Sequence, residues 1–303
     1  MMTISPAKIN LGLEIPFKRE DGYHEIRSIF LRTDFGDDFQ VETFPLSNHQ
    51  IPEFQLVSEN QLPQAKQALF DAVSERGNLT KNILYKSYLA VFPHLKVPEG
   101  VRVHLTKRIP PEGGVGGGSS NAGSLLKFLF SKISLNQDKQ ITLAKSIGAD
   151  VPFFLQENHC IVTGIGENLE PIQVAKGHGI LAIPSYSLST KSMYDGLQRS
   201  LQKTHDSKVW KTLTEDVVRS LRVGDWTSLN GKLENDFEKI AFQVHPDLKE
   251  LKSGILQEGA VYSSLSGSGS CFFGLVAKEQ DQLPLLNSLK SRFPEMDFRS
   301  FSF

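Results

Sequence analysis

Residues 111–121 read PEGGVGGGSSN, and five of the six residues from position 113 to position 118 are glycine. Each glycine in an ordered segment costs about 0.5–1 kcal/mol relative to alanine, because glycine loses more backbone entropy on folding. Before this segment, apolar residues alternate over positions 101–105 and predict a strand. After it, apolar residues at helical spacing over positions 122–129 predict an amphipathic helix. The order is therefore strand, glycine loop, helix.

A glycine loop that leads into a helix places backbone N–H groups around a concavity, and the helix N-terminus adds a partial positive charge. Such a loop can cradle phosphate groups. It is not an ordinary P-loop, because GxxxxGK[ST] occurs nowhere in the chain, and GxGxxG fails because serine stands at the last required glycine. The alternative is a flexible linker or a tight surface turn. Ser119, Ser120 and Asn121 are candidate caps of the helix.

The composition limits the class of protein. The chain has 303 residues, of which 39% are hydrophobic and 22% charged, values typical of a soluble globular protein. The net charge of -1 gives no global basic field for nucleic acid or an anionic membrane. The two cysteines form no CxxC pair or zinc-spaced cluster, so we expect buried reduced thiols. With no signal peptide and no membrane-spanning window, we expect a cytoplasmic enzyme or binding protein.

The start of the chain alternates in polarity over positions 9–15, which predicts a strand with one buried face. Lys8 and Asn10 then lie on the same side of that strand, opposite the core. A turn at positions 21–22 and a second strand at positions 29–31 follow.

The middle of the chain begins with a polar stretch at positions 45–76, which we interpret as a surface excursion with a helix at positions 64–74. A clearer helix is expected to begin after Asn78, its candidate N-cap. Positions 180–183 predict an apolar strand, and a second glycine-rich stretch, SLSGSGSCFFG, occupies positions 264–274.

Three stretches together resemble the GHMP kinases, a superfamily of small-molecule kinases. The glycine loop is similar to the phosphate-binding motif of that superfamily, SPAKINLGLEI at positions 5–15 to its N-terminal motif, and positions 264–274 to its C-terminal glycine motif. Three further stretches narrow the resemblance. KREDGYHEIRSIF at 18–30, GADVPFF at 148–154 and NDFE at 235–238 resemble the 4-diphosphocytidyl-2-C-methyl-D-erythritol kinases, a family of the non-mevalonate isoprenoid route.

The resemblance implies an α+β, two-domain GHMP kinase fold. An N-terminal ribosomal-S5-domain-2-like α/β domain at 1–168 would bind ATP, and a C-terminal ferredoxin-like α+β domain at 169–303 would bind the substrate. The implied ligands are ATP with Mg²⁺ and a cytidine diphosphate derivative as the small-molecule substrate. Nucleic acid and membrane partners are not expected, and the chain is expected to be a monomer or a homodimer.

The same resemblance implies a catalytic pair, Asp150 and Lys8. Asp150 would accept the proton of the substrate hydroxyl as that hydroxyl attacks the γ-phosphoryl group of ATP. Lys8 would keep the carboxylate ionised and stabilise developing charge. From the sequence alone, Asp150 could instead be a helix cap or turn residue, and Lys8 a solvated strand lysine.

The resemblance also implies binding residues, several of which could instead be structural caps, turns or surface residues. For ATP, the candidates are Pro110, Pro111, Gly113, Gly114, Val115, Gly116, Gly117, Gly118, Ser119 and Ser120. For the substrate, they are Asn10, Tyr23, His24, Thr190, Tyr194, Gly267 and Gly269. No fixed protein ligand for a metal is expected beyond a contact from Ser119 or Ser120 to Mg²⁺. Glu112 stands where a small residue is usual, and we expect its carboxylate to point outward.

Two other functions remain open at this stage. The chain could be another GHMP small-molecule kinase, acting on homoserine or mevalonate, which the stretch DGYHEIRS argues against. It could also be a catalytically silent GHMP protein that senses a ligand, which the retention of Lys8, Asp150 and an uninterrupted glycine loop argues against.

Overall fold

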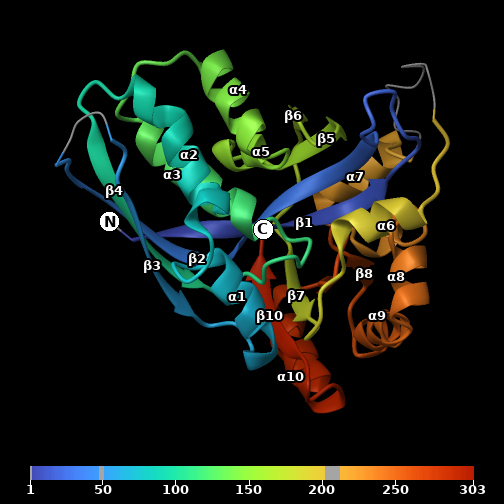
Figure 1. Ribbon diagram of the computed structural model, residues 1–303. Coiled ribbons are helices and arrows are strands. Elements are labelled where there is room, and N and C mark those ends of the chain that lie inside the picture. Colours follow the sequence, from blue (N-terminus) through green and yellow to red (C-terminus); the bar gives the residue numbers. More distant parts are fainter. Residues whose placement is uncertain (1, 48–50, 202–211) are drawn as a thin grey trace. The chain divides into compact units, whose positions relative to one another are not determined.

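The computed structural model describes residues 2–47, 51–201 and 212–303 (Figure 1). The chain forms two compact units, and each is assembled from separate segments. The first unit comprises Met1–Ala7, Gly36–Pro111 and Gly116–Glu157, and the second comprises Lys8–Phe35, Glu112–Val115 and Asn158–Phe303. The expected division between positions 168 and 169 stays a prediction.

The first unit is built on a sheet whose central strand is β4 (Glu99–Lys107). It pairs in parallel with β3 (Phe54–Asn60) and antiparallel with positions 38–45 of the long strand β2 (Ile26–Pro45). The apolar alternation predicted for positions 101–105 is confirmed, because Val101, Val103 and Leu105 are all buried.

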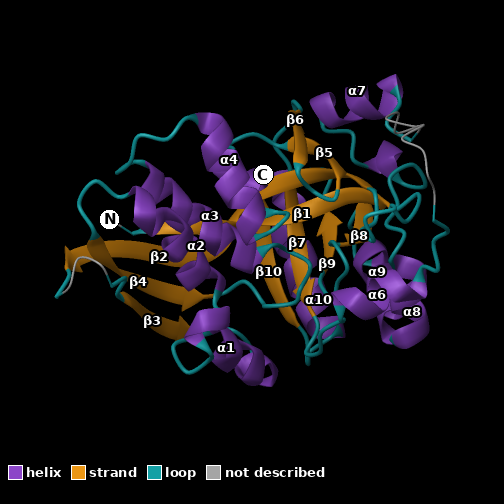
Figure 2. Cartoon of the chain, turned by 45° about the horizontal axis from the view of Figure 1, so that its top comes forward, coloured by secondary structure: helices purple, strands orange, loops and turns teal. Residues whose placement is uncertain are grey.

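Helices cover this sheet and close the core of the first unit (Figure 2). They are α2 (Ile83–Val91), α3 (Gly117–Phe130), α4 (Gln137–Ile147) and α5 (Val151–Leu155), with α1 (Gln67–Val73) as a further short helix. The predicted apolar face of α3 is confirmed: Ala122, Leu125, Leu126 and Leu129 are fully buried against the sheet side chains.

The predicted surface excursion is wrong in one part, because positions 54–60 form strand β3 at the edge of the sheet. Its residues Phe54 and Leu56 are buried. The helix expected at 64–74 is confirmed in outline as a 3₁₀ turn followed by α1. Asn78 does cap a helical turn, but only a 3₁₀ turn, and Asn82 caps α2 itself.

The second unit contains part of β1 (Thr3–Glu14) and the start of β2, where positions 26–30 pair with β5 (Cys160–Gly164). Strand β6 (Asn168–Pro171) pairs with β5 in turn. Further helices of this unit are α6 (Thr190–Gly196), α7 (Glu215–Val223) and α8 (Glu238–Val244).

The C-terminal part of the second unit is a four-stranded antiparallel sheet in the order β10-β7-β9-β8 (Figure 2). Its strands are β7 (His178–Ile183), β8 (Tyr262–Leu265), β9 (Phe272–Leu275) and β10 (Asp297–Ser302). In chain order the strands lie 4-1-3-2, and helices α9 (Asp247–Gln257) and α10 (Gln282–Arg292) contact them. This order is the ferredoxin-like arrangement expected for the C-terminal part.

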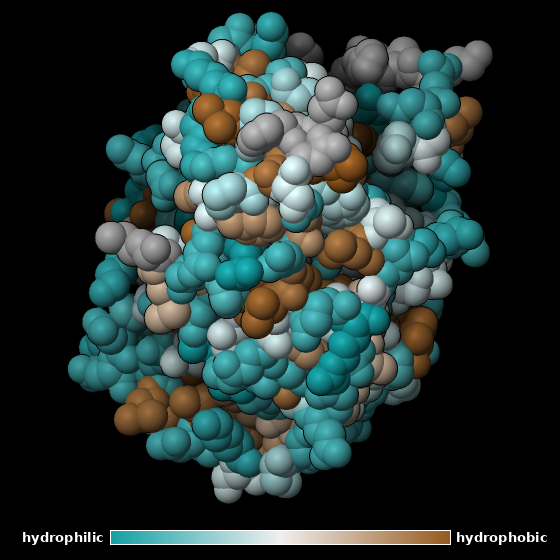
Figure 3. All heavy atoms as spheres, turned by 60° about the vertical axis from the view of Figure 1, so that its left-hand side comes forward, coloured by the Kyte–Doolittle hydropathy of each residue, from teal (hydrophilic) through white to brown (hydrophobic). Residues whose placement is uncertain are grey.

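The face of the molecule drawn in Figure 3 is largely hydrophilic, with scattered hydrophobic side chains. Such scattering is ordinary for a folded protein surface. Across the described ranges, no helix combines the length and apolar character needed to cross a membrane.

Candidate functional site

The glycine loop leads directly into helix α3, as the order strand, loop, helix predicted. Gly116 is the N-cap and has a left-handed backbone with a φ of 72°. Glycine takes this conformation without the steric cost that a Cβ atom brings. The prediction that Ser119, Ser120 or Asn121 caps the helix is therefore wrong, since all three lie within α3 itself.

The loop segment Glu112–Val115 is fixed by backbone contacts in the second unit. The carbonyl oxygen of Val115 accepts the N–H of Lys8 at 3.0 Å, and that of Gly113 accepts the N–H of Cys271 at 3.1 Å. A Cβ atom on Gly114 would lie 1.9 Å from the carbonyl oxygen of Ser266. Close packing against the Ser266 backbone therefore requires glycine at position 114, whether or not a ligand is bound.

The second glycine-rich stretch lies against the first. Gly267 and Gly269 have positive φ angles of 55° and 88°. A Cβ atom on Gly267 would lie 2.8 Å from the carbonyl oxygen of Gly114, and Ser266 Oγ donates a hydrogen bond to that same oxygen at 3.1 Å. This packing supports a bracing role for the second stretch.

The NDFE motif at positions 235–238 holds the second stretch in place. Asn235 Nδ2 donates hydrogen bonds to the carbonyl oxygens of Leu265 and Gly267, both at 2.8 Å. The Glu238 carboxylate accepts the N–H of Leu265 at 3.0 Å. The family resemblance of the sequence indicated this motif, but its structural role becomes visible only in the fold.

Lys8 and Asn10 share one side of β1, but the prediction that this side is exposed is wrong. Both residues are buried, at 3% and 1% exposure. Lys8 Nζ donates a hydrogen bond to Asn10 Oδ1 and lies 4.4 Å from the centroid of the Phe30 ring. Asn10 Nδ2 donates to Ser28 Oγ at 2.9 Å. Residues of β2 therefore cover the face of β1 that the alternation had predicted to be exposed.

Asp150 immediately precedes α5 in the first unit and is half-buried. Asp150 is the N-cap residue of α5, the structural position considered from the sequence, although its side chain makes no capping hydrogen bond to that helix. The turn before it lies beside α3, since a Cβ atom on Gly148 would be 4.0 Å from Ser119 Oγ. The Asp150 segment and the start of α3 are thus neighbours within one unit.

The two serines at the start of α3 differ in environment. Ser120 is buried, and its hydroxyl lies 2.8 Å from the hydroxyl of Ser5. Ser119 is half-buried beside the Gly148 turn. Ser119 is therefore the better placed of the two to contact a phosphate or Mg²⁺. Glu112 is exposed, as expected for an outward-pointing carboxylate.

An aromatic cluster in the second unit includes two of the predicted substrate residues. The ring centroids of His24 and Tyr194 lie 4.8 Å apart, and Tyr194 meets Phe237 edge-on at 4.9 Å. The rings of His24 and Tyr194 are therefore in contact with each other. Burial and the charge of Lys18 lower the pKa of His24. Tyr23 is 61% exposed.

Thr190 begins α6, and its hydroxyl lies 3.0 Å from that of Ser268. The second glycine-rich stretch therefore also reaches the helix that carries Tyr194.

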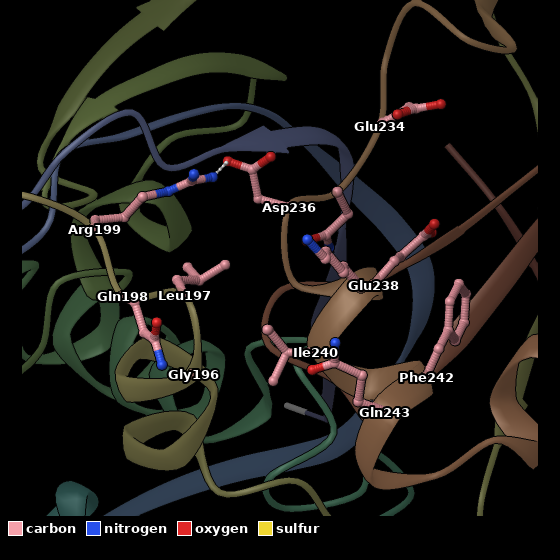
Figure 4. Close-up of a pocket in the computed structure, with 12 residues that line it drawn as sticks. Gly196, Leu197, Gln198, Arg199, Glu234, Asp236, Glu238, Ile240, Phe242 and Gln243 are labelled. Atoms are coloured by element: carbon pink, nitrogen blue, oxygen red, sulfur yellow. Dashed lines mark hydrogen bonds and ion pairs between the residues drawn. The ribbon is translucent and has the colours of Figure 1, made fainter.

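A pocket of about 770 Å³ in the second unit was not predicted from the sequence (Figure 4). It is lined by Gly196 at the end of α6, by the three residues that follow it, and by residues between positions 234 and 243, several of which belong to α8. Figure 4 shows Arg199 and Asp236 facing each other across one side, and their ion pair measures 2.6 Å. Asp236 also accepts the N–H of Ile15 at 2.7 Å. No short motif indicated Arg199, because its partner lies 37 positions away.

Within the described residues, no group of three or more His, Cys, Asp or Glu side chains is arranged to hold a metal ion. A magnesium ion usually keeps several waters and is held by few protein ligands together with substrate phosphates. A hydroxyl such as that of Ser119 fits this mode of binding.

Comparison with known families gives two matches. Residues 82–158 match the family described as the GHMP kinases N terminal domain, and residues 217–295 match the family described as GHMP kinases C terminal.

Two relatives come from Leptospira, and both are named 4-diphosphocytidyl-2-C-methyl-D-erythritol kinase. The protein of Leptospira biflexa serovar Patoc is 54% identical over 303 residues, which cover 100% of this chain and 99% of the relative. The protein of Leptospira interrogans is 50% identical over 304 residues, which cover 99% and 100%.

Among solved structures, a 4-(cytidine 5'-diphospho)-2C-methyl-D-erythritol kinase has a TM-score of 0.78 at 28% identity, covering 100% of this chain and 98% of the other. A mevalonate kinase of L. major in complex with R-mevalonate has a TM-score of 0.68 at 15% identity, covering 100% and 95%. The second likeness concerns the fold alone.

Proposed function

This chain belongs to the GHMP kinases, in the family of 4-diphosphocytidyl-2-C-methyl-D-erythritol kinases, and from that membership we propose that it phosphorylates the 2-hydroxyl of 4-diphosphocytidyl-2-C-methyl-D-erythritol. The products are the 2-phosphate of that substrate and ADP, and the reaction serves the synthesis of isoprenoid precursors. The observation that carries the proposal is the identity to the Leptospira relatives along the whole chain. The family resemblance drawn from the sequence motifs is confirmed, as is the two-domain α+β fold class.

ATP is the phosphoryl donor in this proposal, and it binds at the glycine loop. The first N–H groups of α3 have no acceptor within the helix, so they are available to phosphate oxygens. Bound together with the nucleotide, Mg²⁺ would supply positive charge that offsets the charge of the phosphates. Ser119 is the protein residue proposed to contact the ion.

Asp150 and Lys8 are proposed as the catalytic pair. The substrate 2-hydroxyl attacks the γ-phosphorus, the new O–P bond forms as the bond to the β,γ-bridging oxygen breaks, and the hydroxyl proton passes to the Asp150 carboxylate. Lys8 is held at a fixed position by Asn10 and by the face of Phe30. A fixed ammonium can stabilise charge on the transferred group without reorganising during the reaction.

Recognition of the cytidine part is proposed for Tyr23, His24 and Tyr194, and of the remaining substrate for Asn10, Thr190, Gly267 and Gly269. The lowered pKa keeps His24 neutral near pH 7, so one ring nitrogen can accept and the other donate a hydrogen bond. The contact with Tyr194 restrains the His24 ring. A neutral, restrained imidazole suits the edge of a cytosine base.

A coupled ADP-release assay with a substrate panel tests the proposal. With 4-diphosphocytidyl-2-C-methyl-D-erythritol, homoserine and mevalonate offered separately, we expect turnover with the cytidine substrate alone. Turnover with homoserine or mevalonate instead would identify another GHMP kinase. ATP binding without turnover of any of the three would favour a ligand sensor. A cytoplasmic location and a monomeric or homodimeric state stay predictions.

A further inference from the structure

A buried polar network in the first unit lies at both ends of the glycine loop. Its centre is the ion pair between Asp37 on β2 and Lys107 at the end of β4, whose side chains are 0% and 3% exposed. Asn121 and Ser120 of α3 and Ser5 of β1 complete it, with Asn121 Nδ2 donating to Ser5 Oγ at 3.0 Å. Of these residues, Ser120 and Asn121 were candidates from the sequence, both as helix caps and Ser120 also as a contact for ATP or Mg²⁺.

The Asp37 carboxylate joins the entrance of the loop to the helix beyond it. Oδ1 accepts the backbone N–H groups of Arg108 and Ile109, both at 2.7 Å. Oδ2 accepts Lys107 Nζ at 2.5 Å and Asn121 Nδ2 at 2.9 Å. The negative member of the pair is therefore fully engaged by four donors.

The ammonium group of Lys107 lies next to Gly117, the first residue of α3. A Cβ atom on Gly117 would be 3.0 Å from Lys107 Nζ. A cation near a helix N-terminus opposes the helix dipole, and burying an ion pair seldom adds net stability. The pair with Asp37 is neutral overall, but Lys107 Nζ is among the three atoms nearest the Gly117 Cβ position and no Asp37 atom is. The pair therefore presents its positive end to an anion at the helix N-terminus.

We propose that Lys107 is a positioning residue for the phosphoryl donor, supplying from beneath the glycine loop the positive charge that a P-loop lysine supplies from within it. Asp37 and Asn121 hold its ammonium group at Gly117. The inference rests on the proposed function only in that ATP binds at this loop. Lys107 acts through α3 and the loop backbone, with no contact to the nucleotide.

The test removes both charges at once, because a single substitution would leave one buried charge without its partner. The double variant Asp37→Asn/Lys107→Gln keeps hydrogen-bonding groups at both positions. We expect it to melt close to the wild type and to bind MgATP about ten-fold more weakly, while adenosine binds unchanged. Calorimetry without acceptor substrate measures the melting temperature, the MgATP affinity and the adenosine affinity.

The neighbouring pair Arg108–Asp38 provides the matched control, since it joins β2 to the residue that follows β4 at 2.6 Å but is partly exposed. Asp38→Asn/Arg108→Gln should leave MgATP affinity within about two-fold of the wild type, because solvent screens this pair. Lys107→Arg retains the charge and should bind MgATP better than the double variant does. If the double variant fails to fold, Lys107→Arg provides the comparison with the wild type. Its MgATP affinity must then match that of the wild type within about three-fold.

Wild-type MgATP affinity in a folded Asp37→Asn/Lys107→Gln variant would overturn the inference. Equal weakening of MgATP and adenosine would overturn it as well, because that result means a general distortion of the nucleotide site. A wild-type chain that binds no MgATP would refute the proposed function itself, which distinguishes the two failures.

Discussion

Replacing Gly118 by alanine tests whether glycine is required at this position by the fold or by ligand binding. Gly118 lies in the first turn of α3 and is exposed. A Cβ atom there would have Ile83 Cγ2, at 3.9 Å, as its neighbour among the described residues, so the folded protein has room for a methyl group. Alanine in a helix is favoured over glycine by about 0.5–1 kcal/mol. Gly118→Ala should therefore raise the free energy of unfolding by about that amount.

The same methyl group would obstruct phosphates that approach the N–H groups of α3. We expect MgATP to bind Gly118→Ala at least about ten-fold more weakly, a loss of about 1.4 kcal/mol. Urea unfolding measures the gain in stability, and isothermal titration calorimetry measures the loss of affinity. Gain of stability with loss of ligand affinity is the signature of a glycine retained for the ligand.

Gly114→Ala provides the contrast. Its Cβ atom would lie 1.9 Å from the carbonyl oxygen of Ser266, and the φ of 76° is left-handed. The left-handed backbone alone costs alanine about 1–2 kcal/mol, and the backbone clash adds to it. This variant should lose stability in urea. If Gly118→Ala binds MgATP as the wild type does, the loop does not cradle phosphate at its helix end and the reasoning is refuted.

Three further predictions concern the remaining site residues. Asp150→Asn should lower kcat at least about 10²-fold with unchanged MgATP affinity, and a folded variant with wild-type kcat would remove Asp150 from the mechanism. His24→Ala should raise KM for the cytidine substrate but not for ATP. Because the folded pKa of His24 is lowered, the wild-type KM for that substrate should stay constant from pH 8 to about pH 6.5 and rise only in more acidic solution; a rise beginning above pH 7 would contradict the neutral role. Asn235→Ala should reduce the free energy of unfolding in urea by about 1–3 kcal/mol, because two buried carbonyl oxygens lose their donor, and unchanged stability would contradict the bracing role.

The sequence predicted the elements whose apolar periodicity is regular. Strand β4 and helix α3 were found because each buries one face against the same core. Strand β3 was missed because it is an edge strand in a polar stretch, where alternate residues such as Gln55 and Val57 face solvent. Composition over a long window concealed a seven-residue strand.

Burial of polar residues was the property least accessible to sequence. Alternation predicted an exposed face for Lys8 and Asn10, but a strand covered on both sides retains the same alternation when its polar side chains bond to one another. Lys107 gave no signal for the same reason. Its partner Asp37 is 70 positions away, and only the pairing of β2 with β4 brings the two together.

Identification of the phosphorylated product tests the central claim most directly. The chain is incubated with MgATP and 4-diphosphocytidyl-2-C-methyl-D-erythritol, and the product is analysed by phosphorus NMR and mass spectrometry. The account predicts one new phosphate monoester on the 2-hydroxyl with the diphosphate bridge intact, and one ADP formed for each monoester. Phosphate on another hydroxyl, or release of inorganic phosphate with unchanged substrate, would contradict it.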